Sequence, residues 1–121
     1  DNKLSGVGIK NFRILCKEKK YLINKWSCAN HPHNIYIQFL AELGLVGIFF
    51  LLFFFFYVIF KIFKLILINQ LNSFDIFKFM ILSGIFINLF PFAPSGNFFN
   101  NWISIIYFFP IGFYLYCEKK S

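Results

Sequence analysis

The sequence predicts an all-α integral membrane protein, a polytopic helical bundle with about three transmembrane helices. Hydrophobic residues make up 59% of the 121 residues and charged residues only 14%. A soluble domain of this size would need more polar surface to stay dispersed. The apolar residues also form long blocks. Residues 43–60 contain no charge, and as a helix they would extend about 27 Å, close to the hydrocarbon thickness of a bilayer.

The first half of the chain divides where its polarity changes. Residues 1–34 form the one sizeable polar segment and hold seven of the twelve basic residues. A first membrane helix is expected over residues 35–60, because Lys61 and Lys64 then interrupt the apolar run. Residues 61–75 are expected to form a loop with a short amphipathic stretch at the membrane interface.

Two shorter spans follow. A second helix is expected over residues 76–93, where a proline-containing turn ends it. Residues 94–101 form a brief polar loop, a third span over residues 102–117 contains Pro110, and residues 118–121 form a polar tail. Because the chain starts without a methionine or a signal peptide, we expect it to be the C-terminal piece of a larger polytopic protein. Basic residues lie on both sides of these spans, so charge alone does not decide the orientation.

A turn with two histidines, His31-Pro32-His33-Asn34, directly precedes the first span. Pro32 suits the first turn of a helix, and Asn34 is a good capping residue. The turn therefore lies at a helix N-terminus, where unpaired N–H groups and the helix dipole attract an anion such as a diphosphate. A neutral histidine beside that anion can accept a proton, as transfer from a phosphate-linked donor requires. The alternative is an interfacial capping turn whose histidines contact only water or headgroups.

A polar stripe enters the first span behind this turn. Asn34, Gln38 and Glu42 recur every four residues and fall along one helical face. Such a stripe faces a cavity or another helix, so Gln38 and Glu42 are expected to support the site. Glu42 is expected to form a structural hydrogen bond to a neighbouring helix, and the alternative is that it orients a catalytic group. Gly44 and Gly47 lie at a spacing that lets another helix approach closely, and we interpret them as packing residues.

Two basic residues of the polar segment are candidates for binding a phosphate. The run Gly6-Val7-Gly8 lacks the third glycine of a dinucleotide loop and predicts a tight turn that brings Lys10 and Arg13 to the membrane surface. Arg13 can hold a phosphate in bidentate fashion, whereas a lysine acts as a point charge. The other lysines are expected to face lipid headgroups.

The cysteines leave two alternatives open. Cys16 and Cys28 either form a disulfide that pins the loop below His33, or remain free thiols. Two histidines alone, His31 and His33, leave the coordination of a metal incomplete. We therefore expect neither a metal nor another cofactor.

His33-Asn34, then nine residues, Gly44, two residues and Gly47 resemble the signature near the C-terminal end of the O-antigen ligase family. That family includes O-antigen polymerase-like proteins and protein O-oligosaccharyltransferases. The context is also similar, with GVGIKNF upstream and AELGLVG around the glycines. The resemblance covers about residues 6–60 of the chain.

The resemblance implies a metal-independent glycosyltransferase of the bacterial inner membrane, with more helices than this chain contains. Its donor would be a glycan on undecaprenyl diphosphate at the periplasmic face, which places residues 1–34 and 94–101 in the periplasm. The family's histidine falls on His33, as general base toward the acceptor hydroxyl or as part of the diphosphate site. Arg13 is a candidate for one of the family's diphosphate-binding arginines, with Lys10 and Asn34 beside it and His31 in support.

Several functions stay open at this point. A ligase transfers the glycan to lipid A-core, and a polymerase transfers it to another lipid-linked repeat unit. An alternative of a different class is a membrane transporter or a non-catalytic scaffold of envelope polysaccharide assembly, which the proline-broken helices favour. No ionisable residue lies in the middle of a span, and this opposes that alternative. Membrane lipid is an expected partner, and nucleic acid is not.

Overall fold

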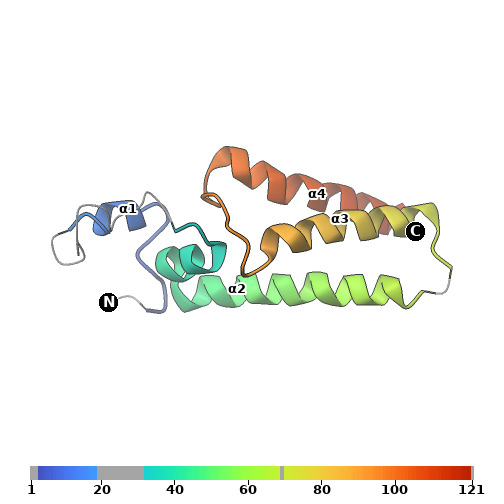
Figure 1. Cartoon of the computed structure of the whole chain (residues 1–121), viewed down its shortest axis with the longest axis horizontal. Helices are drawn as coiled ribbons and strands as arrows, with labels where there is room; N and C mark the ends of the chain where they lie inside the picture. The colour runs from blue at the N-terminus through green and yellow to red at the C-terminus, as the bar shows by residue number, and fades with distance from the viewer. Residues whose placement is uncertain (1–2, 19–31, 69, 121) are drawn as a thin grey trace.

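The computed structural model describes residues 3–18, 32–68 and 70–120. Within these ranges the chain is all-helical and contains no strand. The helices are α1 (Phe12–Leu15), α2 (Ile35–Ile66), α3 (Ser73–Leu89) and α4 (Asn101–Lys120). In Figure 1 the three long helices lie side by side, and α1 lies beyond one end of them. The middle helix, α3, packs against both α2 and α4.

The prediction of an all-helical chain is confirmed for the described residues. In these ranges α2 is the one helix that is long and apolar enough to cross a membrane. The helices α3 and α4, with 17 and 20 residues, lie close to the expected second and third spans. The α4 helix runs continuously through Pro110. That all three helices cross a membrane stays a prediction.

The first long helix differs from the expected one in two ways. It does not end at residue 60 but continues to Ile66, because lysine is a good helix former and Lys61 and Lys64 do not interrupt the backbone hydrogen bonds. It is also broken at Gly44, where φ is +67° and ψ is −156°, a conformation that favours glycine. Figure 1 shows the change of direction between the short first piece and the long second piece.

The starts of two helices are set by asparagine caps. The Asn34 side-chain oxygen accepts hydrogen bonds from the backbone N–H groups of Tyr36 and Ile37, at 2.9 and 3.2 Å. At the start of α3, Asn72 and Asp75 cap each other reciprocally. Each arrangement satisfies N–H groups that have no partner inside the helix. The expected capping role of Asn34 is therefore present in the structure.

Apolar side chains form the contact between the helices and also cover their outer faces. Leu51 and Val58 of α2, and Leu82 of α3, are almost fully buried, and the ring of Phe55 stacks on Phe86 with centroids 5.6 Å apart. The outer faces carry many large exposed apolar residues, among which Phe49 is 68% exposed. Apolar surface of this extent is typical of contact with lipid or with other helices.

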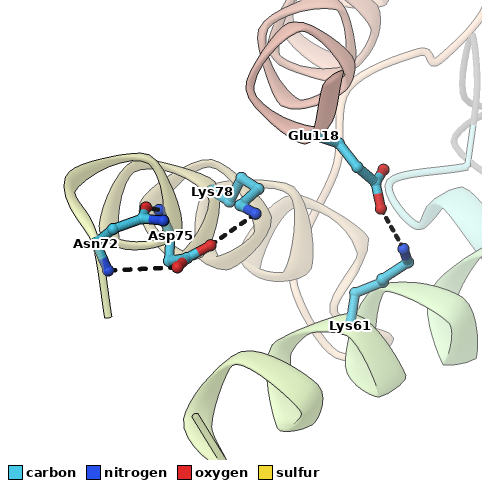
Figure 2. Close-up of polar contacts among 5 residues, drawn as sticks. All are labelled: Lys61, Asn72, Asp75, Lys78 and Glu118. Carbon is cyan, nitrogen blue, oxygen red and sulfur yellow. Dashed lines mark hydrogen bonds and ion pairs between the residues drawn. The ribbon is translucent and has the colours of Figure 1, made fainter. Parts of the chain in front are cut away.

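Charged residues gather at the end of the bundle remote from α1. Figure 2 shows Lys61 of α2 pointing toward Glu118 of α4, and Asp75 lying between Asn72 and Lys78. The Lys78 ammonium is 2.7 Å from the Asp75 carboxylate. The hydrogen bond from Lys78 lowers the pKa of Asp75, and the hydrogen bond from Lys61 lowers the pKa of Glu118.

These shifts predict an acid-sensitive bundle. A carboxyl whose pKa is lower in the folded state stabilises that state above its unfolded pKa, and this contribution is lost as the pH falls through the folded pKa. We expect the thermal midpoint of the protein in detergent to fall on acidification below about pH 4, the unfolded pKa range of carboxyls. The Asp75→Asn variant should show a smaller fall, measured against Glu18→Gln as a control of equal charge. Equal acid dependence in wild type and Asp75→Asn would contradict this prediction.

Candidate functional site

The N-terminal segment lies in the break of α2. Four backbone hydrogen bonds of 2.8–3.2 Å join the two: Val7 N–H to Ala41 O, Gly8 N–H to Glu42 O, Leu45 N–H to Lys3 O and Val46 N–H to Leu4 O. In an unbroken helix the same four groups of α2 would pair with each other across one turn. Residues 3–8 are thus inserted between the two halves of a helical turn and satisfy both. The break leaves no cost of unpaired backbone groups at these four positions.

Two glycines make this insertion possible. A Cβ atom on Gly6 would lie 2.5 Å from the carbonyl of Glu42, and one on Gly44 would lie 2.5 Å from the backbone nitrogen of Gly6. Both residues have φ values near +66°. Gly44 therefore admits a close approach, as expected, but the segment that approaches is a loop of turns and not another helix. The helical interpretation overlooked that a glycine with positive φ ends the helix locally.

The Glu42 side chain binds the N-terminal segment at Lys10, directly after residues 3–8. Its carboxylate accepts a hydrogen bond of 3.0 Å from the backbone N–H of Lys10, and Glu42 is only 2% exposed. Lys10 has a positive φ of 63°, so this bond holds a sharp turn directly ahead of α1. Arg13 lies on α1 and is exposed. Glu42 thus fixes the backbone of Lys10, three residues ahead of Arg13.

The predicted histidine turn contacts the loop between α3 and α4. The backbone carbonyl of His33 accepts a hydrogen bond of 3.0 Å from the Ser95 N–H, and the Asn34 amide donates to the Pro91 carbonyl at 2.6 Å. The Tyr36 hydroxyl donates to the Leu89 carbonyl at 2.8 Å, at the end of α3. The start of α2 is therefore fastened to the end of α3, with the exposed His33 beside the joint.

Gln38 holds the same loop further along. It is fully buried, its amide donates to the Asn97 side-chain oxygen at 2.7 Å, and its own oxygen accepts from the Phe98 N–H at 3.0 Å. The ring of Phe39 packs against Phe98 and Phe99 with centroids 5.0 and 5.4 Å apart. One buried polar side chain and one buried ring of α2 therefore fix the position of this loop.

A polar pocket of about 240 Å³ lies between the N-terminal segment and this loop. It is lined by Lys10, Arg13, Asn97, Asn100 and Asn101. Two cations and three side-chain amides offer many hydrogen-bond donors and a positive potential, which suits a phosphate or a phosphorylated sugar. The three asparagines were not predicted as site residues, although the polar run of residues 97–101 between two apolar spans is visible in the sequence.

The structure describes only part of the remaining predicted residues. Cys16 is disulfide-bonded, but Cys28 lies outside the described residues, as does His31, so their expected roles stay predictions. Gly47 is buried in α2 next to the break. Among the described residues, no group of three His, Cys, Asp or Glu side chains could hold a metal. The Ser95 hydroxyl is buried and has no hydrogen-bond partner in the described part of the chain.

The chain matches no protein-family model, no curated protein and no solved structure in comparisons with known proteins.

Proposed function

We propose that this chain forms the diphosphate-binding part of an O-antigen ligase-like membrane glycosyltransferase. The enzyme would move a glycan from undecaprenyl diphosphate to a sugar hydroxyl of lipid A-core at the periplasmic face of the bacterial inner membrane. One observation carries the proposal: the two basic residues selected from the sequence, Lys10 and Arg13, line one pocket together with three asparagines. That pocket lies at the same end of the bundle as the histidine turn.

The chemistry of the pocket fits the leaving group. When the acceptor hydroxyl attacks the anomeric carbon, the bond to the diphosphate breaks and negative charge develops on the diphosphate oxygens. Lys10 and Arg13 would stabilise that charge, because fixed cations placed where charge develops lower the barrier. His33 would accept the proton of the attacking hydroxyl. The asparagine amides can donate hydrogen bonds to phosphate oxygens or to hydroxyls of the first sugar.

The arrangement of the signature residues gives further support. Gly6 and Gly44 interlock, Glu42 holds Lys10, and Asn34 caps the helix that follows His33. Residues that lie far apart in the signature thus form contacts that hold the same end of the bundle together. A turn that served only as an interfacial cap would not need these connections.

The membrane placement is part of the same proposal. The α2 helix is long and apolar enough to cross a bilayer, and the outer faces of α3 and α4 are apolar as well. Three spans would put residues 3–18 and the 94–101 loop on the same side of the membrane. Both segments line the same pocket, which is consistent with that topology. Helices outside this chain would complete the acceptor site.

Two alternative functions use the same features. A polymerase of the same family would use the same diphosphate site and a lipid-linked repeat unit as acceptor. A transporter is favoured by the break at Gly44, because transporters use broken helices at their substrate sites. The experiment below separates these alternatives.

The test is an envelope polysaccharide gel from cells that lack the full-length gene. Bare lipid A-core with polymer accumulating on undecaprenyl diphosphate would support the ligase. A single repeat unit on the core would indicate the polymerase instead. An unchanged ladder after deletion would reject both transferases and leave the transporter or scaffold.

Arg13 gives a sharper test of the pocket. We expect complementation with Arg13→Ala to reduce glycan transfer at least about tenfold, because a charge-assisted contact with the leaving diphosphate is lost. Arg13→Lys should restore only part of the activity, since a lysine cannot bind two phosphate oxygens in a fork. Lys17→Ala, which removes a nearby charge outside the pocket, is the control. Equal activity of Arg13→Ala and Lys17→Ala would remove Arg13 from the site.

A further inference from the structure

A second polar cavity lies at the opposite end of the bundle. It has a volume of about 240 Å³ and opens between the ends of α2, α3 and α4. Its polar lining consists of Lys61, Lys64, Asp75, Lys78, Tyr114 and Glu118. Figure 2 shows four of these residues with their partners. This cavity shares no residue with the pocket around Arg13.

The cavity carries an uncompensated positive charge. Lys61 pairs with Glu118 and Lys78 pairs with Asp75, and both carboxyls have lowered pKa values and are ionised at neutral pH. Lys64, the third lysine, forms no ion pair with any residue that the structure describes. Three lysines and two carboxylates therefore line one partly open cavity, with Lys64 on its exposed side. A single bound anion would balance this charge.

The position of the cavity indicates the type of anion. Lys64 lies in the last turn of the helix that is apolar enough to cross a membrane, the level at which phospholipid headgroups lie. Leu65 and Ile68 add an apolar side to the cavity, as needed beside the glycerol and acyl part of a lipid. Basic pockets between membrane helices bind anionic headgroups in this way.

We propose that this cavity binds the phosphate group of an anionic phospholipid, with Lys64 as its main contact and Lys61 and Lys78 in support. The Tyr114 hydroxyl, which lines the same cavity, can donate a hydrogen bond to a phosphate oxygen. The proposal requires that α2 crosses a membrane. It is independent of the glycan transfer proposed above, so either can fail without the other.

The test measures lipid bound to the full-length protein by native mass spectrometry after exchange into a neutral detergent. The probes are phosphatidylglycerol, phosphatidylcholine and inorganic phosphate, each added separately. We expect the wild type to retain phosphatidylglycerol in preference to phosphatidylcholine. Lys64→Gln should lower that retention about fivefold, in line with the effect of one lysine near an anionic membrane surface. Lys64→Arg should keep it, because the charge remains.

Lys119→Gln is the matched control, because it removes the same charge from the end of α4 outside the cavity. Equal losses in Lys64→Gln and Lys119→Gln would show diffuse attraction and overturn the proposal. Unchanged retention of phosphatidylglycerol by Lys64→Gln, while Lys64→Arg folds and also retains it, would overturn the proposal too. Displacement of phosphatidylglycerol by millimolar inorganic phosphate would show that the ligand is a free anion and not a lipid.

Discussion

Replacement of Gly44 by alanine is expected to abolish the folded protein. A Cβ at this position would lie 2.5 Å from the Gly6 nitrogen and from the Leu4 carbonyl oxygen. These are backbone atoms, so the clash cannot be relieved by a rotamer change. The residue also has a positive φ of 67°, which adds strain for alanine. Together these effects should destabilise the fold by about 4 kcal/mol or more, at the upper end of single substitutions.

The measurement is the yield and thermal midpoint of the detergent-solubilised full-length protein. Gly6→Ala should cause a comparable loss, because its Cβ meets the same contact from the other side. The controls are Gly84→Ala and Gly112→Ala, where a Cβ has no neighbour within 4 Å. Both controls should fold normally. A Gly44→Ala protein that accumulates and melts like the wild type would contradict the inserted arrangement of residues 3–8.

The double variant adds a further distinction. Gly6 and Gly44 form one contact, so both substitutions disrupt the same contact. The double variant should therefore lose less free energy of unfolding than the sum of the losses in the two single variants. Simple additivity of the two effects would indicate that each glycine has a separate role.

The sequence predicted the long helices because their apolar blocks are long and uninterrupted. It did not predict the break at Gly44, because the residues on both sides continue the same apolar pattern. The groups that satisfy the break belong to residues 3–8, some forty positions earlier in the chain. Periodicity reports which face of a helix is buried but contains no information on such a distant partner.

The polar stripe illustrates the same limit within the site. Its spacing predicted that Asn34, Gln38 and Glu42 avoid lipid, and Gln38 and Glu42 are indeed buried. Each side chain, however, bonds a different segment: Asn34 bonds Pro91, Gln38 bonds Asn97, and Glu42 bonds Lys10. The pattern identified which side chains need partners. Only the fold determines which partners they find, and so the asparagines of the pocket were missed.

Replacement of His33 by alanine is expected to stop transfer while leaving the fold intact. The hydrogen bond that fastens the 94–101 loop uses the His33 backbone carbonyl, which alanine retains. The His33 residue is also exposed, so removal of the ring leaves no cavity in the core. If the imidazole takes the proton from the hydroxyl of the acceptor sugar, removal of the imidazole should lower turnover by about 10²- to 10⁴-fold. The assay is glycan transfer by the purified full-length protein with an undecaprenyl-diphosphate donor.

Three variants separate this chemical role from a structural one. Asn34→Ala removes the cap of α2 and should lower stability by about 1 kcal/mol, so it reports what damage to the turn does to activity. His33→Ala should keep the wild-type thermal midpoint and lose far more activity than Asn34→Ala. His31→Ala tests the neighbouring histidine. If His31→Ala loses turnover and His33→Ala does not, the proton acceptor is His31. If the only effect of His33→Ala is a lower thermal midpoint, the turn is structural and the pocket around Arg13 needs another base.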